Sequence, residues 1–256
     1  MNHIPFNRAE ITNDDRQLLA SSIDNGHISG NGIYTKRAEE LITLALGVKR
    51  TLLTTSCTHA LEMSALLAQL KPGDEIILPA FTFVSSANAF MLYGAKPVFV
   101  DVDESTLNID PMLIEKAITP KTKAIVPVHL YGHAAPMAEI LQIAKENNLF
   151  VIEDNAQAIG CDYTFPNGET KKTGTMGHIG ATSFYPSKNL GAFGDGGALF
   201  TNDKALADKM TMIANHGQSA RYYHDVVGCN SRLDSIQAAI LNIKLQKLDS
   251  YNHARF

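Results

Sequence analysis

A lysine and an aspartate in this chain are placed as partners for chemistry at a carbonyl group. Lys188 lies in the run SFYPSKN, directly before a glycine-rich run at residues 191–197, and Asp154 lies 34 positions earlier, after the apolar run FVIE. A lysine amine condenses with an aldehyde to form a Schiff base, and an acid beside a pyridine nitrogen keeps that ring protonated and able to accept electrons. The order of the two residues and their surroundings therefore indicate pyridoxal phosphate (PLP) chemistry.

The elements that must position these residues are short apolar runs that alternate with helix-period segments from residue 50 onward. Helices are predicted over 60–70, 85–93 and 136–146, and strands over 51–54, 75–78, 97–102, 124–130, 149–152, 181–184 and 198–201. Strands that alternate with helices form a mostly parallel sheet covered on both faces. We therefore expect an α/β fold, with a three-layer α/β/α domain around a mostly parallel sheet of seven strands.

The two ends of the chain and one internal segment depart from this alternation. The first residues, 1–35, are expected to form an arm and a loop, followed by a helix over 35–46. A Pro-Asn-Gly turn predicts a surface hairpin within 162–177. Residues 231–256 have the apolar spacing of one helix without a stop signal, so we expect the chain to end as a fragment or truncated reading frame would.

Ligands of open α/β sheets bind beyond the carboxyl ends of the strands. The polar and aromatic residues that follow the predicted strands are therefore expected to meet in space. These residues are Ser56, Cys57, Thr58, Phe81, Thr82, Phe83, His129, Tyr131, Asp154, Gln157, Ser183 and Lys188. The sequence contains neither the G-x-x-x-x-G-K-[ST] run nor a G-x-G-x-x-G run at the start of a helix. A nucleotide-binding fingerprint therefore does not compete with the PLP interpretation.

Two of these segments have both a binding and a structural interpretation. Ser56, Cys57 and Thr58 join a strand to a helix, where free backbone N–H groups and the helix dipole favour a phosphate. The alternative is an ordinary N-cap, which Ser and Thr supply on many helices. Phe83 is a candidate to stack on a cofactor ring, and a place in the core is the alternative.

The remaining candidates also keep their alternatives. Asp154 has three interpretations: a partner of a ring nitrogen, a structural cap or a ligand of Mg²⁺. Gln157 lies three residues further on, so it would reach the molecule that Asp154 binds from the same helical face. Lys188 is a nucleophile if its amine is buried, and a solvated surface charge otherwise. His129 is expected to be a hydrogen-bonded residue at a strand end. Cys57 is not expected to be a nucleophile, because no His or Asn partner is recognisable.

The composition excludes several function classes. The 256 residues carry a formal net charge of −4, which offers no basic field for nucleic acid. Cys57, Cys161 and Cys229 form no CxxC pair, so we expect neither a disulfide framework nor a metal site. The N-terminus lacks the core of a signal peptide, and no apolar run approaches the about 20 residues that span a bilayer. We therefore expect a cytoplasmic protein.

Taken together, the motifs resemble the DegT/StrS family of PLP-dependent sugar-nucleotide aminotransferases, which have the fold of aspartate aminotransferase (fold type I). The resemblance extends along almost the whole chain, from residues 4–6 to the segment around Gln237. The pieces that carry it are TTSCTHALEM, PGDEIILPAFTFVSSANAF, GAKPVFVDVD, AITPKTKAIVPVHLYG, EDNAQAIG, SFYPSKNLGAFGDGGA and HGQSARYYHDVVGCNSRLDSIQAA. It implies a PLP-binding large domain over 36–250 and, over 251–256, the start of a connection to a small C-terminal domain that is missing here.

The resemblance also implies a role for each matching residue around the cofactor ring. Lys188 looks like the lysine that forms the Schiff base and later moves a proton, and Asp154 looks like the partner of the ring nitrogen. Gln157 resembles the residue near the 3-hydroxyl of the cofactor, and Phe83 the residue that stacks on the ring.

The phosphate of the cofactor has its own set of matching residues. Cys57, Thr58 and Ser183 resemble the phosphate cradle, although many relatives have Gly where Cys57 stands. Asn230 is similar to the asparagine that reaches the cofactor phosphate of the neighbouring subunit, which implies a homodimer with shared active sites.

The reaction that the resemblance implies is ping-pong transfer of an amino group, with glutamate as the donor and a UDP- or dTDP-linked keto-sugar as the acceptor, in polysaccharide, O-antigen or antibiotic-sugar biosynthesis. The runs SFYPSKNLGAFGDGG and GCNSRLD look like relatives that act on 3-keto sugars, whereas ISGNGIYTKRAEE and TTSCTHALEM look like relatives that act on 4-keto sugars. We favour the 3-keto substrate. The alternatives are a dehydratase of the same fold, which has His in place of Lys188, a truncated non-catalytic member, and a nicotinamide oxidoreductase.

Overall fold

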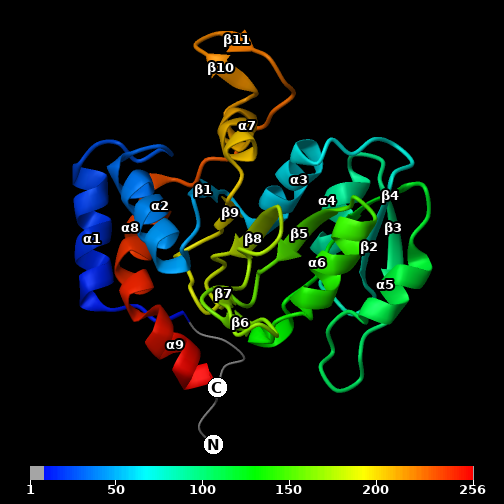
Figure 1. Ribbon diagram of the computed structural model, residues 1–256. Coiled ribbons are helices and arrows are strands. Elements are labelled where there is room, and N and C mark those ends of the chain that lie inside the picture. Colours follow the sequence, from blue (N-terminus) through cyan, green and yellow to red (C-terminus); the bar gives the residue numbers. More distant parts are fainter. Residues whose placement is uncertain (1–8, 256) are drawn as a thin grey trace, which may run out of the picture.

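A sheet of seven strands separates two layers of helices in the computed structural model, which describes residues 9–255 (Figure 1). The strands lie in the order β1-β9-β8-β5-β4-β2-β3. Their bounds are β1 Arg50–Thr54, β2 Glu75–Pro79, β3 Lys96–Val100, β4 Thr122–Ile125, β5 Phe150–Asp154, β8 Ile179–Ser183 and β9 Gly197–Thr201. All seven predicted strands are present, and the α/β prediction is confirmed. The match at residues 4–6 and the outer ends of the predicted terminal segments lie outside the described residues.

One strand of the sheet runs against the others. β9 pairs antiparallel with β1 on one side and with β8 on the other, while the remaining pairs are parallel. The connection from β8 to β9 contains no helix, and without a crossover helix a strand returns antiparallel beside the strand it follows. As a result the start of β9, at Gly197, lies opposite the ends of β1 and β8, at Thr54 and Ser183.

Side chains alternate between the two faces of the sheet, and each face has its own layer of helices. In β1, Leu52 belongs to the apolar cluster that holds α3, α4 and α7, whereas Leu53 belongs to the cluster that holds α2 and α8. The second face is covered further along by α5 and α6, which pack on Ile77 and Val151. Because each such side chain is fully buried, it contributes about 1.5–3 kcal/mol to folding.

The helices match the prediction in the middle of the chain and differ from it at both ends. They are α1 Asn13–Asp24, α2 Ile33–Leu46, α3 Cys57–Leu67, α4 Ser85–Met91, α5 Pro111–Ala117, α6 Met137–Glu146, α7 Lys204–Ala214, α8 Ser235–Lys244 and α9 Leu248–Arg255, with 3₁₀ turns at Leu130–Gly132 and Leu245–Lys247. The one helix predicted over 231–256 is therefore two helices joined by a turn.

The segment expected as an N-terminal arm and loop contains the helix α1. A reciprocal capping box starts this helix, because the Thr12 hydroxyl accepts from the Asp15 N–H while the Asp15 carboxylate accepts from the Thr12 N–H. α1 packs against α8 from the far end of the chain. The domain limits at residues 35 and 250 stay a prediction.

Two smaller features complete the fold. β4 ends at Ile125 rather than at residue 130, because Pro127 has no N–H to continue the ladder. The predicted hairpin within 162–177 is present as β6 Asp162–Thr164 and β7 Thr170–Lys172, and a second hairpin, β10 Gln218–Ala220 and β11 Tyr223–His224, projects beyond α7 (Figure 1). Among the helices of residues 9–255, none has the length and apolar character that crossing a membrane requires.

Candidate active site

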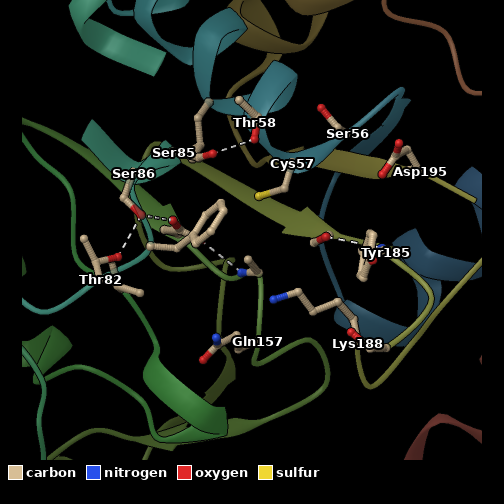
Figure 2. Close-up of a pocket in the computed structure, with 18 of the residues that line it drawn as sticks. Ser56, Cys57, Thr58, Thr82, Ser85, Ser86, Gln157, Tyr185, Lys188 and Asp195 are labelled. Carbon is tan, nitrogen blue, oxygen red and sulfur yellow. Dashed lines mark hydrogen bonds between the residues drawn. The ribbon is translucent and has the colours of Figure 1, made fainter. Parts of the chain in front are cut away.

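A cavity of about 480 Å³ opens where the parallel strands end, at the edge of the sheet that the sequence predicted (Figure 2). Phe81, His129, Tyr131 and Asn230 are not among the residues that line it. The predicted residues that do line it are Ser56, Cys57, Thr58, Thr82, Phe83, Asp154, Gln157, Ser183 and Lys188.

Lys188 and Asp154 reach this cavity from neighbouring strand ends. Lys188 lies on the loop after β8, and its half-buried side chain extends into the cavity (Figure 2). Asp154 closes β5 and is only 4% exposed. Its Oδ2 accepts from Ser86 Oγ at 2.7 Å, and its Oδ1 accepts from the Ala156 N–H at 3.1 Å. Both oxygens are thus held in one orientation.

Burial is the main influence on the acidity of Asp154. Desolvation raises the pKa of this carboxyl group above its usual value, and the hydrogen bonds from Ser86 and Ala156 oppose the rise. A buried carboxylate of this kind gains most from a partner that brings a positive charge or a charge-assisted N–H. The protonated nitrogen of a pyridine ring is such a partner.

The start of α3 has the features of an anion site and also a conventional cap. Ser56 Oγ accepts from the His59 N–H at 3.0 Å, so the N-cap interpretation holds for Ser56. Within residues 9–255, the N–H groups of Cys57 and Thr58 donate to no protein acceptor. Such free N–H groups at a helix N-terminus bind phosphate. One turn therefore combines a cap with two free N–H groups that are available to an anion.

The start of β9 touches this turn so closely that only glycine fits. A Cβ placed on Gly197 would lie 2.5 Å from the Cys57 nitrogen and 2.4 Å from the Ser56 carbonyl carbon. Real Cβ atoms do not approach backbone so closely, so any side chain at this position must displace the turn.

We predict that Gly197→Ala weakens PLP binding by at least about tenfold, because it moves the free N–H groups of Cys57 and Thr58 away from the phosphate. The matched control is Gly194→Ala, whose new methyl group first meets the amide end of the Gln237 side chain rather than backbone. PLP titration followed by fluorescence measures both variants. Equal affinities would show that the turn is not the phosphate site.

The amide of Gln157 is oriented by the backbone. Its Oε1 accepts from the Tyr131 N–H at 2.8 Å, which leaves the Nε2 donors available to a ligand. Tyr131 has a left-handed backbone conformation with φ of 52°, an arrangement uncommon for a residue with a side chain. Phe83 is 72% exposed at the mouth of the cavity, so the alternative of a core aromatic is wrong for this residue.

His129 is a buried structural residue, as the sequence indicated. Its Nδ1 accepts from the Ala135 N–H at 3.0 Å, so its Nε2 carries the proton and donates to Glu153 Oε2 at 2.9 Å. Glu153, fully buried, also accepts from the N–H groups of Gly174, Met176 and Gly177. Four donors from two segments thus converge on one carboxylate, and they fix the segment after the β6–β7 hairpin against β5.

We predict that Glu153→Gln lowers the free energy of unfolding by about 3 kcal/mol, because the amide NH₂ would face N–H donors and leave them unsatisfied. Glu169→Gln on the β6–β7 hairpin is the control. It removes only an exposed ion pair with Lys171 at 3.1 Å, worth at most about 1 kcal/mol. Urea unfolding of both variants measures the difference, and equal midpoints would contradict the role assigned to Glu153.

Several residues of the site were not predicted from the sequence. Ser86 orients Asp154, and Thr82 Oγ1 in turn lies 2.8 Å from Ser86 Oγ, so a chain of hydroxyl groups ends on the acid. The available signal was the Ser-Ser pair that opens the helix after β2. Asp195 and Gly196 line the cavity because they precede the reversed strand β9. A rule that collects only residues after strands omits them.

The fold and this site define a class of protein. An open α/β sheet with a cavity at its strand ends, lined by a lysine, a buried acid and a helix start with free N–H groups, matches the PLP-dependent aminotransferases of fold type I. The model of the DegT/DnrJ/EryC1/StrS aminotransferase family matches residues 9–256. The chain belongs to this family.

Known proteins similar to this chain are longer than it. It is 48% identical over 224 residues to the pleiotropic regulatory protein of Geobacillus stearothermophilus, covering 88% of this chain and 59% of that protein. It is 47% identical over 208 residues to UDP-2-acetamido-2-deoxy-3-oxo-D-glucuronate aminotransferase of Pseudomonas aeruginosa, covering 81% and 56%. The structure of NtdA from Bacillus subtilis with bound cofactor PMP (pyridoxamine phosphate) superimposes with a TM-score of 0.84 at 35% identity, covering 94% of this chain and 55% of that one.

Proposed function

We propose that the protein to which this chain belongs is a PLP-dependent aminotransferase that transfers an amino group from glutamate to a keto-sugar nucleotide. One observation carries the proposal: Lys188, Asp154 and the free N–H groups at the start of α3 line a single cavity. These are the three kinds of group that an aldehyde, a pyridine nitrogen and a phosphate require.

The residues present fit PLP at each of its polar groups. The N–H groups of Cys57 and Thr58 would hold the phosphate, with the Ser183 hydroxyl beside them. Asp154 would accept from the ring nitrogen, and the Nε2 of Gln157 would donate to the 3-hydroxyl oxygen.

PLP supplies an aldehyde and a ring that accepts an electron pair from an adjacent carbon. The chain supplies the rest. Lys188 would provide the amine that holds the cofactor, and its Nζ would take up and return the proton that amino transfer moves. Asp154 would place a negative charge beside the ring nitrogen, and Phe83, at the mouth of the cavity, would cover the ring.

For the acceptor we favour a 3-keto sugar linked to UDP or dTDP. The support is the run SFYPSKNLGAFGDGG and the similarity to a relative whose name specifies a 3-oxo sugar. A 4-keto sugar is the competing substrate, supported by the runs ISGNGIYTKRAEE and TTSCTHALEM.

Absorption spectroscopy of the purified chain tests the proposal in two steps. Addition of PLP should produce an absorption band at the violet end of the visible range. Glutamate should shift this absorption into the ultraviolet as its amino group is transferred to the cofactor. Matched 3-keto and 4-keto sugar nucleotides are then added. Return of the first band with the 3-keto sugar alone is expected, return with the 4-keto sugar alone would replace the favoured substrate, and a chain that stays colourless would refute the cofactor assignment.

A non-catalytic role is the second candidate. The similarity to a relative named a pleiotropic regulatory protein favours it. The two candidates differ in one result, because a regulatory member would bind PLP without transferring the amino group of glutamate to it.

We also propose that the protein is a homodimer with shared sites. Asn230 is exposed and lies outside the cavity of its own chain, and it pairs with Asn215 just before the β10–β11 hairpin. Tyr222 and Tyr223 of this hairpin, which projects beyond α7 (Figure 1), are 77% and 70% exposed. If Asn230 serves the partner's site, mixing Lys188→Ala with Asn230→Ala chains should restore one intact site per mixed dimer. Mixtures no more active than either variant alone, or a monomer by light scattering, would refute the shared site.

A further inference from the structure

The loop that carries Lys188 is held in place from the last helix of the described chain. Arg255 on α9 donates from Nη2 to the carbonyl oxygens of Ser187, at 3.1 Å, and of Lys188 itself, at 3.2 Å. The guanidinium group therefore binds the peptide units on both sides of the Lys188 α-carbon. Within residues 9–255, the Lys188 carbonyl accepts a hydrogen bond from no group other than Arg255.

A second contact from the same helix joins two loops of the site. Asn252 Oδ1 accepts from Asn189 Nδ2 at 2.9 Å, and Asn252 Nδ2 donates to the Ile159 carbonyl at 3.1 Å. Asn189 Nδ2 also donates to that carbonyl, at 2.9 Å. Three groups thus meet at Ile159: the residue after Lys188, the loop that follows Asp154 and Gln157, and α9.

The packing around this junction leaves the helix little freedom to shift. Leu248, at the start of α9, is buried in the same apolar cluster as Ile159 and Leu190. Gly160 has a positive φ of 86°, and a Cβ there would lie 3.0 Å from both Asn252 Nδ2 and Leu248 Cδ2. The helix therefore sits against the loop so closely that a side chain at position 160 would crowd it.

From these contacts we infer that Asn252 and Arg255 are positioning residues for the Schiff-base lysine. They fix the main chain at Lys188 relative to Asp154 and Gln157. The α-carbon of Lys188 therefore stays in place, and the amine moves only by rotation of the Lys188 side chain. A displacement of about 1 Å at a reacting group reduces rates by as much as about 10²-fold. The inference rests on the proposed role of Lys188, and it gives residues 251–255 a part in the site.

The test compares Asn252→Ala and Arg255→Ala with His253→Ala, an exposed residue of the same helix. Amide hydrogen exchange of the cofactor-free chain is the first measurement. In the first two variants, peptides over 184–192 should exchange about tenfold faster, while peptides over the core strand β4 stay unchanged. Equal exchange at 184–192, or faster exchange throughout the chain, would overturn the inference.

The second measurement is the rate at which PLP forms a Schiff base with Lys188. Samples taken at set times are reduced with borohydride, and the intact mass of each sample gives the fraction of chain that carries PLP. This rate should fall about tenfold in Asn252→Ala and Arg255→Ala and stay unchanged in His253→Ala. Arg255→Lys, which keeps one charged donor, should recover most of it. Faster loop exchange with an unchanged trapping rate would mean that α9 orders the loop without positioning the amine, and would overturn the inference.

The two proposals fail in different ways. If the unaltered chain traps no PLP, the proposed function fails, and the exchange data on the cofactor-free chain still decide whether α9 holds the loop. If the unaltered chain traps PLP and the variants behave like His253→Ala, the function stands and the positioning role fails.

Discussion

Lys188→Ala is expected to abolish covalent attachment of PLP and to lower amino transfer by at least about 10⁴-fold, because it removes both the amine that binds the aldehyde and the group that carries the proton. The cavity itself should persist. Five other segments of the chain also line it, and the side chain of Lys188 is only half-buried. Intact mass after borohydride treatment and single-turnover kinetics with glutamate measure the two losses.

Lys188→Arg is the control for charge. It keeps a cation of similar length in the cavity, but a guanidinium group does not condense with an aldehyde under these conditions. This variant should still bind PLP without covalent attachment. A covalent adduct in either variant would identify another lysine as the Schiff-base residue.

Asp154→Asn is expected to lower amino transfer by about 10³-fold while leaving the covalent attachment of PLP to Lys188 intact. The amide carries no charge to stabilise a protonated ring nitrogen, and loss of one preorganised electrostatic partner has this order of effect. Single-turnover rates with glutamate measure the loss, and a rate within about threefold of the unaltered chain would contradict the assignment.

The same substitution should stabilise the cofactor-free chain at neutral pH. Because burial raises the pKa of Asp154 in the folded state, its contribution to stability is fully present below the unfolded pKa and is lost as the pH rises through the folded value. Asn does not titrate. The urea midpoint of Asp154→Asn should therefore exceed that of the unaltered chain at pH 7, and the excess should disappear toward pH 4.

Ser86→Ala provides the complementary measurement. It removes the 2.7 Å hydrogen bond that opposes the rise in the pKa of Asp154, so the loss of stability between acid and neutral pH should be larger than in the unaltered chain. If both variants show the pH dependence of the unaltered chain, then Asp154 is not the group that titrates.

The sequence predicted the sheet because each strand is a short apolar run, and burial on both faces favours such runs. Lys188, Asp154 and Gln157 were predictable for a related reason, since all three follow strands that end at one edge. The direction of β9 was missed, although the helix-free connection at 184–196 contained the signal. α1 was missed because its residues are mostly polar, even though the Thr12–Asp15 capping box marks its start.

The contacts made by side chains at long range had no signal in the sequence. Nothing in residues 251–255 distinguishes Asn252 or Arg255 from any other polar residue of a helix. Their partners lie more than sixty positions away, and only the folded chain brings them together. Glu153 is similar, because its four donors come from separate segments that the apolar pattern does not connect.

Adjacent positions of β5 hold two buried acids with separate tasks. Glu153 points to one face of the sheet and fixes a backbone segment, whereas Asp154 points to the other and lines the cavity. Successive residues of a strand face opposite ways, so gaining or losing one residue in β5 would send each acid to the other's side. A replacement of one apolar residue of this strand by another of similar size keeps both acids in place, whereas a change in the strand's length loses the fold and the site together.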